Sequence, residues 1–519
     1  MKNLKIQSSN LFLIVFILLI LSCSANQEFN IPGPPDSVNL NETLYFEIDL
    51  VNRIDDTFKV RMFTNNLSSD NSIFQFPATV PGTYNVMDIG RYVKGFNVYD
   101  KQFNKIHTDH ISTNQWKISD PEQAYVIEYY ISETWDTPVS EHPIYLMAGS
   151  SIENDNVLLN TFCVLGYPTG LKNKPFTLKI NYPENWTIGT SLEKTDEGYY
   201  QAKNFDYLVD SPVLLGEISS ETTTVDNTTI NVYTYSKTNQ ITADQIIPDI
   251  KKTVSDAKQF LQGLPVDRYS FIFHFEDEGA GALEHSFSSV YVLEEQPFTQ
   301  GSLDWVTYHE FFHIVTPLNI HSEIIEDFNF VTPTPSQHLW LYEGVTEWAS
   351  DMMKFRNGTM NLDGLFNEIT YKIDVDKNYF DPSYSLVDIG LYSYTTSGNE
   401  QFGNIYNRGA LVAMLLDIRL LELSNGTFGL RELILELMAT YGPENAFSEA
   451  NFFNSLVDMT YPEIDDFVKN YIEDNQPLPI KDYFQLLGIN YDATNNIFTV
   501  SNNPTTDQQY LLNRWSVNF

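Results

Sequence analysis

The run from His309 to His313 reads His-Glu-Phe-Phe-His, with two histidines four residues apart and a glutamate beside the first. Positions four apart share one face of an α-helix, so both imidazoles can reach one metal ion. Glu310 can then take a proton from a water that the ion binds. The chain has only 9 histidines, which makes a chance match rare. The pattern predicts a catalytic zinc site; the alternative is a structural helix with two satisfied histidines.

A catalytic zinc ion usually takes three protein ligands and keeps a fourth position open. The apolar stretch from Leu339 to Trp348 predicts a second, buried helix that carries Glu343 and Glu347. A buried carboxylate without a partner is costly, and metal ligation would remove that cost. Either glutamate could be the third ligand, and the other could orient a ligand histidine.

The elements that must position these residues fall into two parts. From 43 to 222, alternating apolar residues and frequent turn signals predict an all-β domain. From 223 to 476, strands and a helix over 245–261 precede a mostly helical stretch, which predicts the catalytic domain. The expected fold class is therefore multidomain α+β, with an N-terminal all-β domain and a catalytic domain whose C-terminal half is mainly helical. Residues 477–519 are expected to form a short tail.

The N-terminal residues predict export. Residues 1–22 have a basic start and an apolar run from Leu11 to Leu21, which is too short to span a bilayer and is typical of a signal peptide. Cys23 follows a small residue, as in a bacterial lipobox, where the cysteine becomes the acylated N-terminus. Residues 23–42 would be a tether. The expected product is an exported lipoprotein of the cell envelope; the alternative is a plain secretory signal with a chance cysteine.

Composition excludes some partners. Acidic residues outnumber basic ones by 68 to 30, for a net charge of −38, which argues against binding to nucleic acid or to an anionic membrane through charge. The only other cysteine, Cys163, lies in an apolar run and is expected to be buried. If Cys23 is lipidated, no disulfide can form within the chain. The oligomeric state is not indicated.

Together these motifs resemble the glycyl aminopeptidase family of zinc metallopeptidases, peptidase family M61, whose members are gluzincins with a thermolysin-like catalytic domain. The family patterns H-E-F-F-H and L-W-x-x-E-G-x-T are similar to His309–His313 and Leu339–Thr346. The resemblance implies one Zn²⁺ per chain, with Glu343, thirty positions after His313, as the third ligand. It extends from roughly Tyr45 to Tyr491.

The segment Gly281-Ala282-Leu283-Glu284-His285 is similar to the family pattern G-G-L-E-H. The resemblance implies a strand that binds a peptide substrate through Gly281 and Ala282, while Glu284 holds the free ammonium group. Glycine here would allow close backbone approach. The alternative is a loop with a solvated Glu284, and His285 is either a pocket residue or a structural one.

Two further segments resemble the family. Tyr406–Leu411 is similar to Y-x-K/R-G-A-L, which implies that Tyr406 supports the tetrahedral intermediate; the alternative is a core tyrosine at the start of a buried helix. Pro81–Tyr84 and the downstream Arg91 are similar to the family's P-G-S-Y and its arginine.

The chain also departs from the family. The family's W-N-x-K-R stretch after the second histidine is replaced by Ile314–Asn319, so substrate contacts made there are in doubt. Many members end in a PDZ domain, and too few residues follow Leu487 for a complete one. Either that domain is absent or a remnant packs on the body.

The expected function is that of a zinc metallopeptidase in which Glu310 assists attack of metal-bound water on a peptide. The family resemblance favours an aminopeptidase that releases small N-terminal residues, Gly or Ala, from peptides with a free N-terminus. One alternative is a thermolysin-like endopeptidase, in which Glu284 binds no amine. Another is a surface binding lipoprotein with a non-catalytic zinc site, against which the intact Glu310 argues.

Overall fold

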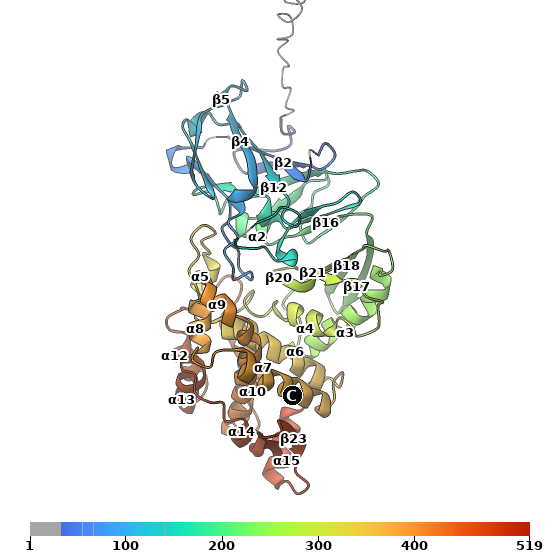
Figure 1. The fold of residues 1–519 in the computed structure, drawn as a ribbon, viewed down its shortest axis with the longest axis vertical. Coiled ribbons are helices and arrows are strands. Elements are labelled where there is room, and N and C mark those ends of the chain that lie inside the picture. Colours follow the sequence, from blue (N-terminus) through green and yellow to red (C-terminus); the bar gives the residue numbers. More distant parts are fainter. Residues whose placement is uncertain (1–32, 54, 66, 140, 519) are drawn as a thin grey trace, which may run out of the picture.

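The computed structural model describes residues 33–518 except 54, 66 and 140. The expected signal peptide, Cys23 and the first part of the tether lie outside these residues, so the lipid anchor stays a prediction. Within the described part of the chain, no helix is long and apolar enough to cross a membrane. Figure 1 shows a strand-rich N-terminal part stacked on a helical C-terminal part.

The N-terminal part folds as three β-sheets, which confirms the predicted all-β domain. In the largest sheet, only the pair β1–β12 is parallel. Phe58, Val60 and Met62 alternate along β2 and are fully buried, as a strand with one face on the core requires. In spatial order the sheet contains β14 (Glu193–Lys194), β15 (Tyr200–Ala202), β12 (Phe176–Asn181), β1 (Leu44–Asp49), β2 (Thr57–Phe63), β8 (Val126–Ser132), β4 (Val93–Tyr99) and β5 (Lys105–Ile106).

Two four-stranded sheets complete this domain. Cys163 lies in its core and is fully buried, as expected. The first sheet contains β13 (Thr187–Thr190), β16 (Val213–Gly216), β10 (Asn156–Leu159) and β9 (Ser151–Ile152); the second contains β11 (Tyr167–Pro168), β3 (Ile73–Gln75), β7 (Gln115–Ile118) and β6 (Thr108–Ser112). The short helix α2 (Phe205–Val209) follows β15.

A five-stranded sheet opens the second domain. Its order is β17 (Ser219–Val225), β18 (Thr228–Ser236), β19 (Arg268–Glu276), β21 (Ser288–Glu294) and β20 (Ala280–His285). The sheet thus begins at Ser219, a few residues before the expected boundary at 223. β20 lies at the edge and pairs only with β21, as expected for a strand that could receive a peptide. The helix expected over 245–261 is α3 (Ala243–Leu261), and it packs on β17 and β18.

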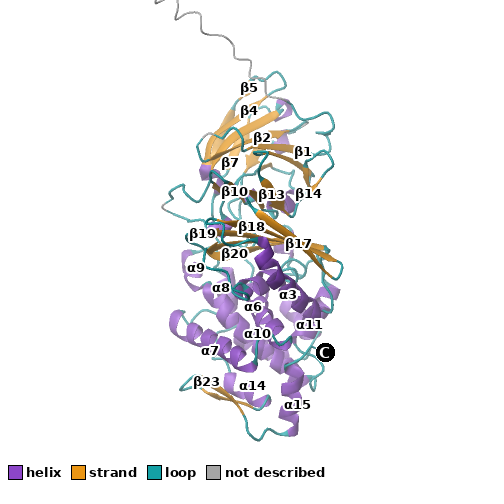
Figure 2. Ribbon diagram, turned by 90° about the vertical axis from the view of Figure 1, so that its right-hand side faces the viewer, coloured by secondary structure: helices purple, strands orange, loops and turns teal. Residues whose placement is uncertain are grey.

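The rest of the second domain is helical, which confirms the predicted mainly helical C-terminal half. Figure 2 shows the helices gathered below the five-stranded sheet. They are α4 (Asp304–Phe312), α5 (Glu323–Glu326), a π-helical turn (Trp340–Gly344), α6 (Val345–Arg356), α7 (Leu362–Tyr379), α8 (Leu386–Leu391), α9 (Thr396–Gln401), α10 (Gly403–Leu423), α11 (Leu430–Thr440), α12 (Phe452–Asp458), α13 (Glu463–Val468) and a second π-helical turn (Lys469–Glu473).

Two glycines set the distance between α10 and the π-helical turn. A Cβ atom on Gly344 would lie 2.7 Å from the Cα of Gly409, and one on Gly409 would lie 2.8 Å from the Cα of Gly344. No side chain fits there, so the two backbones touch. This contact explains the glycines in both motifs, and it brings Glu343 and Tyr406, which lie near them in sequence, to one place.

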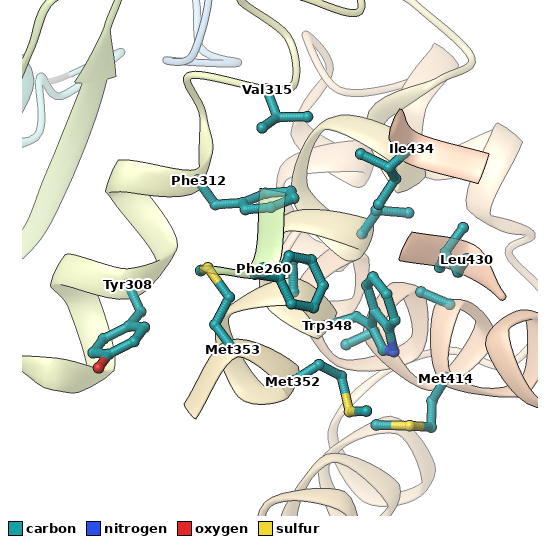
Figure 3. Close-up of a cluster of buried hydrophobic side chains, with 14 of the residues drawn as sticks. Phe260, Tyr308, Phe312, Val315, Trp348, Met352, Met353, Met414, Leu430 and Ile434 are labelled. Carbon is teal, nitrogen blue, oxygen red and sulfur yellow. The ribbon is translucent and has the colours of Figure 1, made fainter. Parts of the chain in front are cut away.

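Aromatic and sulfur-containing side chains fill the space behind α4 and α6. The ring of Phe260 lies 6.1 Å from that of Phe312 and 6.0 Å from that of Trp348. Figure 3 shows these rings together with Met352 and Met353, and the five side chains come from three helices. Each of the five side chains is fully buried, so α3, α4 and α6 share one hydrophobic core. This core fixes the position of α4 against α3 and α6.

The C-terminal residues fold and pack on the helical domain. They form α14 (Ile480–Leu486), the hairpin of β22 (Ile489–Asp492) and β23 (Ile497–Val500), and α15 (Thr506–Trp515). Trp515 is fully buried, and its carbonyl oxygen accepts a hydrogen bond of 3.0 Å from the Nε atom of Arg356. Residues 477–519, expected to form a short tail, are thus folded against the helical domain.

A buried histidine joins the two domains and makes stability depend on pH. His274 on β19 is fully buried, and its Nε2 atom lies 2.9 Å from Oδ1 of Asn156 on β10. Burial, with a smaller contribution from Lys237, lowers the pKa of His274 to about 3. In the unfolded chain His274 binds a proton as the pH falls through about 6.5, whereas in the folded chain it stays neutral until about pH 3. The free energy of unfolding therefore keeps its full value above pH 6.5 and decreases below it.

We expect His274→Gln to reduce this acid sensitivity. Between pH 7.5 and 5.5 the wild type should lose about 1.4 kcal/mol more unfolding free energy than the variant, because one proton is taken up only by the unfolded wild type. Urea unfolding at the two pH values measures the difference. The exposed His107→Gln serves as the control. Equal losses in wild type and His274→Gln would contradict the prediction.

Candidate active site

Helix α4 and the adjoining π-helical turn bring three ligand atoms together. The Nε2 atoms of His309 and His313 lie 3.4 Å and 3.7 Å from the Oε2 atom of Glu343. All three ligand atoms lie within 4.8 Å of one another, and all three residues are buried. Ligands bound tetrahedrally to zinc at about 2.0–2.1 Å are separated by roughly 3.4 Å, so the group fits a zinc ion. Glu347 lies outside this group.

The remaining ring nitrogens are held by other groups. The Nδ1 atom of His309 lies 2.9 Å from Oε2 of Glu347, and the Nδ1 atom of His313 lies 2.8 Å from the carbonyl oxygen of Thr316. When both Nδ1 atoms donate to these oxygens, the Nε2 lone pairs are left for a metal. Glu347 therefore occupies the orienting position that the sequence left open.

Burial and nearby charges set the protonation of these groups. Burial lowers the pKa of His313 to about 4, which favours the neutral imidazole that a metal requires. Burial alone would raise the pKa of Glu347, but the charge of Lys372, at 2.9 Å, and the hydrogen bond with His309 hold it well below its usual value. Glu347 is thus an ionised acceptor for His309.

Glu310 faces the same place from α4. Its Oε2 atom is buried and has no hydrogen-bond partner among the described residues, as expected of a carboxylate whose partner would be a metal-site water. Burial, together with the charges of Glu343 and Glu347, raises the pKa of Glu310 to about 8, against the opposing effect of His309. Such a group can both accept and return a proton near neutral pH.

Glu284 also lies close to Glu310. Oxygen atoms of both glutamates and a ring nitrogen of His313 lie within 4.8 Å of one another, which makes a second possible metal group. The group with both histidines fits zinc better, because it uses two nitrogen ligands and leaves Glu310 free. Burial, followed by the charges of Glu343 and Glu310, raises the pKa of Glu284 well above its usual value.

Alternate side chains of strand β20 contact different domains. Leu283 belongs to the hydrophobic core of the β domain, whereas Glu284 faces the metal group. A Cβ atom on Gly281 would lie 2.6 Å from Met147, so the close approach that this glycine permits is made by the β domain. Strand β20 is thus packed against the β domain on one face.

The β domain contributes a tyrosine to the site. The hydroxyl of Tyr84 donates a hydrogen bond of 2.9 Å to Oε1 of Glu343, the oxygen that does not face the histidines. Tyr84 has a φ angle of +44°, which is uncommon for a non-glycine residue. Gly82, two residues earlier, has a φ of +84°, and a Cβ atom there would lie 2.6 Å from Oε1 of Glu284. The sequence marked this loop by resemblance and assigned it no role.

Tyr406 also reaches the metal group. Its ring centre lies 5.5 Å from that of His309 and 5.6 Å from that of Phe402. Burial, then the charges of Glu343 and Glu284, and a hydrogen bond with Glu343 raise its pKa well above the usual value. The hydroxyl therefore stays protonated and can donate a hydrogen bond.

The arginines of the two motifs point elsewhere. Arg408 donates to the carbonyl oxygen of Gln476 at 2.8 Å and pairs with Asp376 at 3.4 Å, so it ties α10 to neighbouring segments. Arg91 donates to the carbonyl oxygen of Glu141 at 2.6 Å and also to that of His142. Both arginines support the fold around the site.

Three further histidines are buried near the site or in the helical domain. Nδ1 of His285 lies 3.0 Å from Oδ1 of Asp210, which belongs to the β domain. His338 is fully buried against Phe452, at a ring distance of 5.0 Å, and His321 is 6% exposed. His321 and His338 are therefore packing residues.

A β domain set on a sheet-and-helix domain, with two histidines and a glutamate positioned as above, defines a zinc metallopeptidase of the gluzincin type. The Peptidase M61 N-terminal domain matches residues 45–217, and the M61 glycyl aminopeptidase domain matches residues 303–412. Together they cover more than half of the chain. The protein belongs to the M61 glycyl aminopeptidase family.

Solved structures share the fold. An aminopeptidase N family protein from Idiomarina loihiensis superposes with a TM-score of 0.76 at 18% identity, over 86% of this chain and 78% of that one. The M1 zinc metallopeptidase from Deinococcus radiodurans gives 0.53 at 11% identity, over 84% and 94%. Legionella pneumophila aminopeptidase A gives 0.51 at 13% identity, over 85% and 50%. Among curated proteins, none matches the sequence.

Proposed function

We propose that the protein is an aminopeptidase that acts on peptides with a free N-terminus. The observation that supports this most is the position of Glu284, whose carboxylate lies beside Glu310 and His313 at the end of an edge strand. Burial and the charges of Glu343 and Glu310 raise the pKa of Glu284, and a cationic ammonium group beside Glu284 would favour its ionised form. An ammonium held by Glu284 would place the first peptide bond next to the metal group.

The side chains divide the work of hydrolysis. His309, His313 and Glu343 would hold a zinc ion, which when bound lowers the pKa of water and polarises a peptide carbonyl. Glu310 would accept the proton of the attacking water and pass it to the leaving amine. Tyr406 would donate a hydrogen bond to the carbonyl oxygen as negative charge develops on it.

Structurally similar enzymes give further support. The M1 zinc metallopeptidase from Deinococcus radiodurans has been solved as a mutant bound to Tyr-Ser-Ala, and Legionella pneumophila aminopeptidase A in complex with aspartic acid. The preference for Gly or Ala as the first residue comes from the family resemblance alone and is part of the proposal.

Hydrolysis of arylamides tests the proposal. The chain from residue 24 onward is assayed with glycyl- and alanyl-arylamides and their N-acetylated forms, with chelator and with zinc restored. We expect cleavage of the free-amine forms only, lost with chelator and regained with zinc. Glu284→Gln should raise KM for free-amine substrates about tenfold, because a charged hydrogen bond to the ammonium is weakened. Glu294→Gln, on the adjacent strand and exposed, is the control.

Other outcomes identify the alternatives. Equal cleavage of acetylated and free-amine substrates would show an endopeptidase and remove the proposed role of Glu284. Bound zinc without turnover of any of these substrates would contradict the aminopeptidase proposal and favour a binding protein.

A further inference from the structure

A cavity of about 440 Å³ lies between the two domains, beyond the end of β20. Helix α2 and residues 80–81 line it from the β domain, and residues 284–287 and the segment after α4 line it from the catalytic domain. Figure 1 shows α2 and β20 near the boundary between the two domains. Pockets for small ligands are often of this size and often lie between domains.

The walls of this cavity are mainly apolar. They include Phe162, Phe287, Ile314, Pro317, Leu318 and Phe330. Lys203 and Glu444 lie at its exposed rim and pair at 3.5 Å, whereas the acidic lining residues Asp206, Asp210 and Glu284 are partly buried. The apolar part of the lining suits an apolar group.

One buried polar atom inside the cavity wall has no partner. The side chain of His285 is 4% exposed, and its Nδ1 atom lies 3.0 Å from Oδ1 of Asp210. Its Nε2 atom is buried and makes no hydrogen bond among the described residues. If Nδ1 donates a hydrogen bond to Asp210, the Nε2 atom of the neutral ring is a hydrogen-bond acceptor. A ligand with a hydroxyl or N–H group could then donate the hydrogen bond that Nε2 lacks.

Glu284 belongs both to the lining of the cavity and to the surroundings of the metal group. This residue lines the cavity, and its carboxylate is within 4.8 Å of ligand atoms of Glu310 and His313. Pro81 lines the cavity too, next to Gly82, which lies against the same carboxylate. A group attached to the carbon beside an ammonium at Glu284 would therefore have the cavity as its neighbour.

We propose that this cavity binds the apolar side chain of the substrate's first residue, so that the enzyme accepts large apolar residues as well as glycine and alanine. The inference rests on the proposed function, because it takes Glu284 as the group that holds the ammonium. Tyrosine is the best match, since its ring fits the apolar walls and its hydroxyl can donate to Nε2 of His285.

Filling the cavity tests the inference. The zinc-loaded protein is assayed with glycyl-, phenylalanyl- and tyrosyl-arylamides. Ser286 lies on the lining and is half-buried, so Ser286→Trp should fill the space and Ser286→Ala should leave it open. We expect Ser286→Trp to lower kcat/KM for the two aromatic substrates at least about tenfold relative to the glycyl substrate, the discrimination that a filled apolar pocket gives. Ser286→Ala should not change the ratio.

A second position and a binding measurement keep the test decisive. Leu318→Trp fills the cavity from the opposite segment and replaces Ser286→Trp if that variant does not fold. Calorimetric titration with L-tyrosine and glycine should show tyrosine binding that the filled variants lose. An unchanged ratio and unchanged tyrosine binding would overturn the inference. If no free-amine substrate is cleaved by the wild type, the proposed function fails, and the tyrosine titration alone decides for or against the cavity.

Discussion

Replacing Glu310 by glutamine is expected to lower kcat about 10²- to 10⁴-fold while zinc content stays near one ion per chain. Glutamine has nearly the same shape and cannot accept the proton of water. Glu310 lies outside the group of His309, His313 and Glu343, so metal binding should survive its replacement. Steady-state kinetics on glycyl-arylamide and metal analysis of the same sample measure the two quantities.

The matched control is Glu436→Gln on the exposed side of α11, which should keep full activity. A Glu310→Gln variant with kcat within a factor of ten of wild type would show that another group accepts the proton. Loss of zinc together with activity would show that Glu310 contributes to the metal site itself, for which the neighbouring group with Glu284 gives a structural basis.

Replacing Tyr84 by phenylalanine is expected to weaken zinc binding by about 10- to 100-fold, the usual effect of removing a hydrogen bond from a metal ligand. The hydroxyl of Tyr84 occupies Oε1 of Glu343 and leaves Oε2 to face the histidines. Phenylalanine keeps the ring, which packs against Phe402 at 5.0 Å. Without the hydroxyl, the carboxylate is held less firmly, and its Oε1 atom loses the hydrogen bond from Tyr84.

Competition with a chelator measures the zinc affinity, and Tyr510→Phe, at a half-exposed site on α15, controls for loss of a tyrosine hydroxyl. Unchanged zinc affinity and unchanged kcat in Tyr84→Phe would exclude a role for this contact. The unusual backbone angle of Tyr84 makes a role the expected result, because strained residues persist where the surrounding structure requires them.

The metal ligands could be predicted because their arrangement is local. His309 and His313 lie on one helix, and the spacing alone places their rings on one face. Spacing could not decide whether Glu343 or Glu347 is the third ligand. The two residues are four positions apart, so they share one face of a helix. The choice depends on how the π-helical turn is rotated against α4 and α10, which the contact of Gly344 with Gly409 fixes.

The contributions of the β domain could not be predicted from local patterns. Tyr84 and Glu343 are separated by 259 residues, so only the docking of the domains brings them together. The family resemblance marked the loop of Tyr84 without giving it a task. The cavity at His285 likewise forms from segments of both domains. Read separately, the sequence of each segment predicts only a turn or the end of a strand.

The hydrogen bond between Tyr84 and Glu343 limits how this protein can be divided. A catalytic domain expressed alone would carry all three proposed zinc ligands and the proposed general base, yet Glu343 would lack the hydrogen bond from Tyr84. Exchange of catalytic domains between relatives would join a loop from one parent to a carboxylate from the other. The β domain and the catalytic domain are therefore expected to be inherited, and engineered, as a single unit.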